Sequence, residues 1–421
     1  MKKLIDKDKI YNIMKLLNLK ETNIMKIKDK HNYQMGGGIA YLAILLSCFV
    51  PEMSQAAAID GDFVTIEGKL PGGKRMPMTL ERKTAERIVW EDTFKDPLRG
   101  LHNKKWDLSG HQITQQEMEL FPLLPELEDL DLHVCDIKSM HGFPNQPSLK
   151  KLNLSSNKGI QLNTIPTFPN LEELYMCECD LRSLDGLPVF PKLKKINIAG
   201  NAYIGSVEAL SQLPSLEELI ARGCHSIPET LPSLPGLKKL SFEAFERKPL
   251  DFLNKVPNLE SLNISRYMSR EHLILTMPLL SNLRELNFSH CEGFASLRGI
   301  SEKCPNLESL DFSENYIFSS SQETTQQLKQ QFIESLRELV NLKQLKSLNL
   351  SGCSIADENK EIIEALSQLK QLKELNLTAG HRLPKLSEDT LEVLSNTLRD
   401  CEIRFTDNRF YIRTYLNGEK K

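Results

Sequence analysis

Several features that would mark a function are absent from this sequence of 421 residues. Neither sign of charge dominates, because 53 lysine and arginine side chains oppose 56 aspartate and glutamate side chains. A formal net charge of −3 provides no overall field to attract nucleic acid or an anionic membrane surface. We therefore expect neither as a partner.

The cysteines and histidines lack the spacing that catalysis or metal binding requires. Cys177 and Cys179 are separated by a single residue. No histidine or acidic residue nearby completes a zinc site, and no cysteine has the ordered histidine and acid of an activated nucleophile. We expect no enzyme activity, metal, cofactor or small-molecule substrate.

The apolar run near the N-terminus is too short to cross a bilayer. It covers Ile39 to Val50 after a lysine-rich stretch, whereas a membrane-spanning helix needs about 20 apolar residues. Such a run fits the hydrophobic part of a secretory signal peptide. Small residues around positions 54–58 predict a leader over residues 1–58, cut after Ala56 or Ala58, and no transmembrane helix in the mature chain.

Alternatives remain open for this leader. Met25 precedes Lys26 and Lys28 and would make a more ordinary start codon than Met1. Cys48 ends a loose bacterial lipobox and would then carry a lipid. An uncleaved apolar helix would instead cap the protein or lie on a membrane. We predict a secreted, periplasmic or envelope protein, and a cytoplasmic one if the segment is not a signal.

What the sequence has in abundance is one cassette, LxxLxLxx(N/C). The first leucines of the eleven copies are Leu127, Leu149, Leu171, Leu193, Leu216, Leu237, Leu259, Leu283, Leu307, Leu345 and Leu372. Most steps between copies are 21 to 24 residues, and the longest is 38. A repeat of that length indicates a solenoid rather than one compact core.

Each cassette predicts one short strand. Leu152 and Leu154 point to one face while Asn153 points to the other. A single strand cannot bury its apolar face alone, so neighbouring cassettes must stack into a parallel sheet.

This pattern resembles the leucine-rich repeat family over residues 103–406. The resemblance includes a degenerate opening cassette and a degenerate closing one, which contain Trp106, Leu108, His111, Leu398, Cys401 and Ile403. It implies an α/β solenoid with a curved parallel β-sheet on its concave face.

The arms that connect the cassettes change along the chain. Up to Leu259 they are short and predict extended or 3₁₀ structure, whereas residues 322–340 and 362–369 carry apolar side chains at helical spacing. The C-terminal third should therefore alternate strand and helix. Residues 59–102, with a strand at 63–67 and a helix at 79–94, predict an N-terminal cap, and residues 407–421 a C-terminal cap or tail.

The last cassette position is a cysteine or an asparagine in eight of the copies. It holds Cys135, Asn157, Cys179, Asn201, Cys224, Cys291, Asn315 and Cys353. The resemblance implies that these side chains turn the chain and bond to neighbouring backbone from inside. Because cysteines a full repeat apart should lie about 10 Å from each other, beyond the disulfide limit of about 7 Å, we predict buried thiols.

Two columns of exposed residues carry the remaining information. The charges after each first leucine alternate in sign from Glu128 to Glu260, which predicts ion pairs that fix the stacking register. The middle exposed position is mostly Asn or Asp. Tyr175, Ile220 and Ser241 interrupt it, and with Arg222 and Glu243 they predict a patch on the concave face.

We therefore expect a non-catalytic scaffold that binds a protein partner through Tyr175, Ile220, Arg222 and Glu243, since aromatic and arginine side chains often anchor interfaces. An enzyme that uses the repeats to read its substrate is disfavoured, because the sequence after Cys401 is too short for a catalytic domain. An intracellular structural or regulatory subunit is the third possibility. The partner, its source and the oligomeric state stay open.

Overall fold

The computed structural model divides the chain into two units, residues 1–85 and 86–421. It describes residues 63–69, 75–81, 104–243, 249–266, 273–291, 296–315, 322–353, 355–357, 359–379, 386–406 and 411–420. The predicted leader, with Cys48 and the cleavage sites after Ala56 and Ala58, lies outside these residues.

The first unit contains a β-hairpin. Strand β1 (Phe63–Lys69) pairs antiparallel with β2 (Arg75–Glu81), which confirms the strand predicted at 63–67. The helix predicted from Thr79 is wrong at its start, because Thr79 and Leu80 belong to β2. Met76, Met78 and Leu80 alternate with other residues, and this period of two favours a strand. Residues 82–94 lie outside the described residues.

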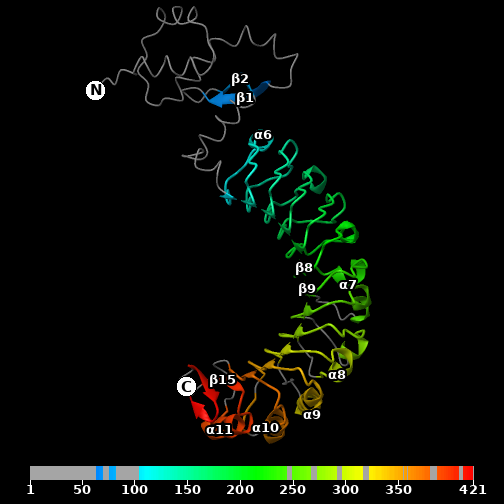
Figure 1. The fold of residues 1–421 in the computed structure, drawn as a ribbon, viewed down its shortest axis with the longest axis vertical. Helices are drawn as coiled ribbons and strands as arrows, with labels where there is room; N and C mark the ends of the chain where they lie inside the picture. The colour runs from blue at the N-terminus through cyan, green and yellow to red at the C-terminus, as the bar shows by residue number, and fades with distance from the viewer. Residues whose placement is uncertain are drawn as a thin grey trace, which may run out of the picture. The chain divides into compact units, whose positions relative to one another are not determined.

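In the second unit every cassette forms one strand, and the strands pair in sequence order (Figure 1). Within the described residues they make a fifteen-stranded sheet that is parallel from β3 to β15. Its parallel strands are β3 (Lys105–Asp107), β4 (Asp129–Asp131), β5 (Lys151–Asn153), β6 (Glu173–Tyr175), β7 (Lys195–Asn197), β8 (Glu218–Ala221), β9 (Lys239–Phe242), β10 (Ser261–Asn263), β11 (Glu285–Asn287), β12 (Ser309–Asp311), β13 (Ser347–Asn349), β14 (Glu374–Asn376) and β15 (Glu402–Thr406).

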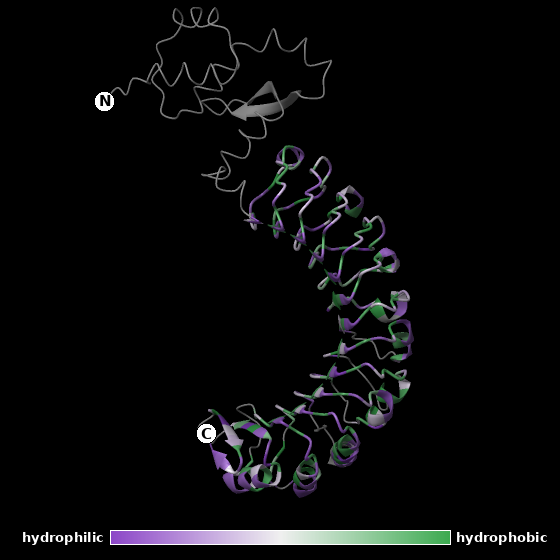
Figure 2. Cartoon of the chain, in the orientation of Figure 1, coloured by the Kyte–Doolittle hydropathy of each residue, from purple (hydrophilic) through white to green (hydrophobic). Residues whose placement is uncertain are grey.

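The register places equivalent cassette residues side by side. Leu130, Leu152 and Leu174 are direct partners in β4, β5 and β6, and none of the three is exposed to solvent. Figure 2 shows hydrophilic and hydrophobic residues alternating along each turn of the solenoid. The leucines form a continuous core, to which each turn contributes contacts with its neighbours.

The arms lie on the outer side of the curved sheet (Figure 1). In the N-terminal half they contain α6 (Gln115–Glu119), η3 (Leu162–Thr164), η4 (Glu208–Gln212), α7 (Ile227–Thr230), η5 (Asp251–Lys255) and η6 (Leu273–Thr276). The later arms contain α8 (Ile300–Lys303), α9 (Gln322–Glu338), η7 (Leu339–Asn341), α10 (Lys360–Ser367) and α11 (Glu388–Thr397). The predicted change from short arms to helices is confirmed.

Aromatic side chains stack through the first arms behind the leucine core. The ring of Phe121 lies 4.5 Å from that of Phe143, which lies 6.2 Å from Phe168, and Phe190 follows at 6.4 Å. All four side chains are buried. One aromatic ring per turn thus fills the space that short arms leave between sheet and outer surface.

The C-terminal end of the sheet reverses direction. Strands β16 (Ile412–Leu416) and β17 (Glu419–Lys420) add antiparallel to β15, and the Tyr415 ring packs 5.3 Å from Phe405. Within the described part of the chain, no helix is both long enough and apolar enough to cross a membrane.

Candidate binding surface on the concave face

Cassette positions are numbered here from 1 at the first leucine to 9 at the Asn/Cys slot. Positions 1, 4 and 6 point into the core, and position 9 is buried in the turn that follows the strand. Positions 2, 3, 5 and 7 form columns along the sheet. The column positions are those that a partner could contact.

The asparagines at position 9 link the backbone of their own turn to that of the preceding turn. Asn201 donates through Nδ2 to the carbonyls of Met176 and Ile198, at 2.9 and 2.7 Å. Its Oδ1 accepts from the backbone N–H groups of Cys179 and Leu181, both at 3.0 Å. Asn157 repeats this arrangement. The slot asparagines thus bond to neighbouring backbone from inside the turn.

The cysteines at position 9 make fewer hydrogen bonds to the backbone than the asparagines do. The Cys224 thiol donates to the carbonyl of Ile198 at 3.2 Å, and the Cys135 thiol to Leu108 at 3.1 Å. Burial raises the pKa of each of these two thiols to about 11. Both thiols are therefore protonated donors at neutral pH, and the predicted burial of the slot cysteines is confirmed.

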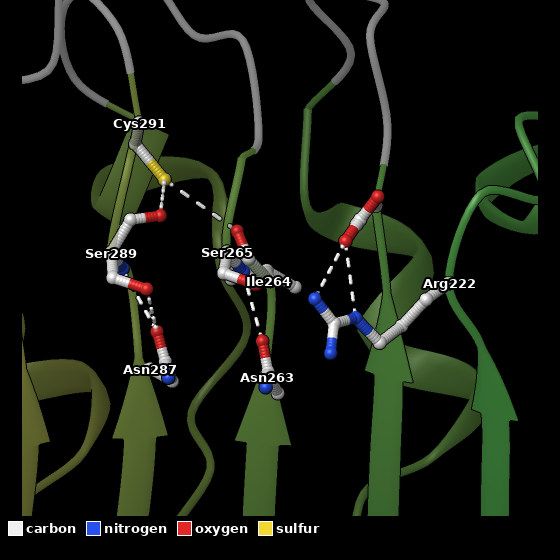
Figure 3. A network of polar contacts seen from close by, with 8 residues as sticks. Arg222, Asn263, Ile264, Ser265, Asn287, Ser289 and Cys291 are labelled. Carbon is white, nitrogen blue, oxygen red and sulfur yellow. Dashed lines mark hydrogen bonds and ion pairs between the residues drawn. The ribbon is translucent and has the colours of Figure 1, made fainter.

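The Asn and Asp side chains at position 5 also have a backbone role. Asn263 Oδ1 accepts the N–H of Ser265 at 3.0 Å, and Asn287 Oδ1 accepts that of Ser289 at 2.9 Å (Figure 3). The same bond links position 5 to position 7 at Asp107, Asp131, Asn153, Asn197, Asp311, Asn349 and Asn376. These side chains end each strand with an Asx turn.

The Asx turn thus explains why position 5 is Asn or Asp in most turns. Tyr175 and Ile220 are exceptions to this pattern. Neither residue can make the Asx-turn bond. Tyr175 instead donates its hydroxyl to Glu173 Oε2 at 2.7 Å, and Lys151 Nζ lies 5.3 Å from its ring centroid. Burial and the neighbouring Glu173 carboxylate raise the pKa of the Tyr175 phenol, so it stays neutral.

The structure brings one predicted pair into contact and keeps another pair apart. Arg222 donates through Nε to Glu243 Oε1 at 3.0 Å (Figure 3), and Glu243 is 9% exposed. Tyr175 and Ile220 share a face but are both partners of Asn197 on the strand between them. They should lie about 10 Å apart at two strand spacings, so the four residues line one strip without forming one contact cluster.

Position 7 changes over the same stretch of sheet. This position is a serine in six turns, at Ser109, Ser155, Ser265, Ser289, Ser313 and Ser351, whereas β6 to β9 are followed by Cys177, Ala199, Arg222 and Glu243. Comparing positions 5 and 7 together would have shown that both columns depart over one stretch of sheet. We call Tyr175, Cys177, Ala199, Ile220 and Arg222 the concave patch.

A further aromatic side chain near these strands was missed. Tyr203 lies just beyond the slot residue Asn201, is 74% exposed, and has the Arg182 guanidinium 4.9 Å from its ring centroid. It lies in a turn outside the cassette columns. Column patterns therefore gave no signal for it.

The predicted charge ladder is present at position 2. Glu128 pairs with Lys104 at 2.7 Å and with Lys150 at 2.8 Å on the two adjoining strands. Lys194–Glu172 and Lys238–Glu217 continue it, and Glu308 pairs with both Arg284 and Lys346. The ladder extends beyond the predicted span at both ends.

Comparison with known families agrees with this architecture. The family model described as Leucine Rich Repeat matches residues 344–369, which contain strand β13 and helix α10. The chain therefore carries leucine-rich repeats, as the cassette pattern predicted. No curated protein shows a significant match to the sequence.

Three solved structures are similar at low identity. An internalin from Listeria monocytogenes is 17% identical, with 76% of this chain and 93% of that chain covered and a TM-score of 0.41. TLR13, in complex with ssRNA13, is 20% identical, with 69% and 50% covered and a TM-score of 0.41. Mouse RP105, in complex with MD-1, is 18% identical, with 72% and 49% covered and a TM-score of 0.41. This chain spans about half the length of the last two.

Proposed function

We propose that this protein is a non-catalytic scaffold that binds a protein partner through the concave patch. The observation that carries the proposal is that position 5 lacks its usual Asn or Asp on β6, β8 and β9, while position 7 lacks its usual serine after each of the strands β6 to β9. On the other described strands from β3 to β14 position 5 is an Asn or Asp whose side chain makes the Asx turn. The fold itself gives no reason for a tyrosine, an isoleucine and an arginine here.

The chemistry of the patch suits protein recognition. Tyrosine and arginine are the residue types that most often dominate binding energy, and they act best when neighbouring contacts exclude water. Arg222 is held by Glu243, so less side-chain entropy is lost when a partner binds. Ile220 and Ala199 add apolar surface between the charged groups.

The flanking charges favour a protein over a polyanion. Lys195 and Glu218 pair at 2.9 Å beside the patch, and acids and lysines alternate along the position-2 ladder. A ligand that requires a field of one sign would find both signs here. A protein surface with mixed charges fits such a border.

The structure also supplies a conservative test variant. Replacing Tyr175 and Ile220 with asparagine restores the residue that the other turns use, and the new side chains can form the Asx turn. We expect the double variant to keep the circular dichroism spectrum and melting temperature of the wild type. The amount of partner that it captures in affinity purification from the producing organism should fall at least tenfold.

A matched control removes equal apolar surface elsewhere. Leu123 and Leu279 are 57% and 61% exposed and lie in the arms, so the variant Leu123→Asn/Leu279→Asn should capture partners as the wild type does. If the Tyr175→Asn/Ile220→Asn variant retains every captured protein, the patch is rejected. If the wild type captures nothing specifically, the scaffold function is rejected as well.

We further propose that the protein acts outside the cytoplasm, in the cell envelope or secreted. The basic stretch, the short apolar run and the small residues at 54–58 support this proposal. N-terminal sequencing of the purified mature protein tests it. A first residue of Ile59 or Ala57 is expected, whereas a chain that begins at Met1 or Met25 would contradict secretion by this signal.

A further inference from the structure

The charges at position 3 follow one rule in the first half of the sheet. Lys105, Asp129, Lys151, Glu173, Lys195, Glu218 and Lys239 alternate in sign from β3 to β9, in direct register. Lys105–Asp129 and Lys195–Glu218 are ion pairs at 3.2 and 2.9 Å. Each acid in this stretch thus has a lysine on the next strand.

Beyond β9 the lysines of this column are absent. From β10 to β15, position 3 holds Ser261, Glu285, Ser309, Ser347, Glu374 and Glu402. Glu374 and Glu402 are direct register partners on β14 and β15, about 4.8 Å apart along the sheet. Like charges placed opposite each other destabilise a sheet, and this pair is the column's one like-charged pair in the described register.

The serines leave room beside these acids. A hollow of about 230 Å³ opens over β12 to β15, lined by the position-3 residues Ser309, Ser347, Glu374 and Glu402 together with position-5 residues. A water molecule takes about 30 Å³ in the liquid, so the end of a lysine or arginine side chain fits. Its ionisable lining is Asp311, Glu374, Glu402 and Arg404, three acids and one base, which gives a net charge of −2.

Glu374 differs from the acids of β3 to β9 in its partners. Its hydrogen bond with a described residue comes from Ser347 Oγ at 3.4 Å, and no ion pair to it is formed within the described chain. Arg404 Nε donates a hydrogen bond to Glu402 Oε1 at 2.9 Å. The nearby lysines at position 2 form ion pairs with other acids, Lys346 with Glu308 and Lys373 with Asp400.

From this charge complementarity we infer that the hollow over β12 to β15 receives a lysine or arginine side chain from a protein partner. The incoming cation would take the place that a lysine holds between the acids of β3 to β9, and would relieve the repulsion between Glu374 and Glu402. The inference concerns a second surface and does not depend on the concave patch.

A labelled decalysine peptide is the probe. Fluorescence anisotropy at low salt should show binding to the wild type, and decaglutamine should not bind. Glu374→Gln/Glu402→Gln should weaken decalysine binding at least tenfold. Arg404→Gln should tighten decalysine binding severalfold, because this substitution removes the cation that competes for Glu402. A loss of folding could not produce such a gain in affinity.

The matched control removes the same charge from paired acids. Glu172 and Glu217 have lysine partners, so Glu172→Gln/Glu217→Gln should change decalysine affinity less than twofold. Equal weakening by the two double variants would overturn the inference, as would an Arg404→Gln variant that binds no tighter. Tyr175→Asn/Ile220→Asn should bind decalysine like the wild type, which separates this surface from the proposed function.

Discussion

At the scale of single residues, the slot at position 9 shows that asparagine and cysteine are not equivalent solutions. Asn201 satisfies two backbone carbonyls and two backbone N–H groups, whereas the Cys224 thiol satisfies one carbonyl. Asn157, Asn201 and Asn315 each accept the N–H of a cysteine in the preceding turn. Each asparagine therefore completes a bond that the cysteine slot before it does not provide.

The difference predicts unequal costs of truncation. Asn201→Ala removes the hydrogen-bond partner of three buried backbone groups and leaves the Ile198 carbonyl with the Cys224 thiol alone, so it should lower the free energy of unfolding by about 3 kcal/mol. Cys224→Ala loses one weak bond and should cost about 1 kcal/mol. Urea titrations followed by circular dichroism compare the two midpoints. Equal midpoints for both variants would show that the slot is held by packing and not by its hydrogen bonds.

At the scale of the strand, the ion pairs of the position-2 ladder join several pairs of neighbouring turns. Glu128 accepts hydrogen bonds from Lys104 and Lys150 on the strands on either side, and these bonds lower the pKa of its carboxyl to about 2. A slip by one repeat would place acid beside acid along the whole ladder. Exposed ion pairs contribute little to stability singly, so we assign them to register.

Acid should therefore weaken the ladder over a defined range. The unfolded carboxyl titrates near its ordinary value of about 4.3 and the folded one near about 2. Because the folded pKa is the lower one, the stabilisation is complete above about pH 4.3 and is lost as the pH falls through about 2. A carbon NMR titration of Glu128 should find its midpoint near the lower value.

Removal of both lysines tests the cause of this shift. Lys104→Gln/Lys150→Gln should raise the Glu128 midpoint toward about 4.3. Lys158→Gln/Lys343→Gln removes the same charge from exposed lysines away from Glu128 and should leave the midpoint in place. A midpoint that both double variants move equally would mean that net charge, and not the ladder, sets the pKa.

At the scale of the whole molecule, a solenoid must protect the sheet edge at each end. At the C-terminal end β16 and β17 reverse direction, and Tyr415 and Phe405 are buried there. An uncovered edge strand offers unpaired backbone groups and invites association with other chains. The closing hairpin is therefore expected to keep the solenoid from pairing end to end.

Truncation tests the closing hairpin. A variant that ends at Thr406 lacks β16 and β17, so it should melt at a lower temperature and associate as its concentration rises. Size-exclusion chromatography with light scattering measures the association. A variant that ends at Leu416 keeps the Tyr415 packing and should be affected less. A monomeric Thr406 variant with an unchanged melting temperature would contradict this role.

Much of the architecture was predictable because each cassette carries its own pattern. The leucines at positions 1, 4 and 6, the slot residues, and the apolar spacing of 322–340 depend on local periodicity. The helix predicted from Thr79 was wrong at its start, because alternate apolar residues in a short segment are compatible with either a strand or a helix. Of the candidate site, Tyr175 and Ile220 were found from a column of neighbours, whereas Tyr203 lies outside any column.

The stacking of turns, the buried face of each strand and the alternation of charges between neighbours all follow from the repeat, because one repeat length fixes all three. The folded chain adds which backbone groups the slot residues satisfy, the contact of Arg222 with Glu243, and the placement of Glu374 opposite Glu402 beside a hollow. Those outcomes depend on the register between residues in different turns. Periodicity within one cassette does not contain that information.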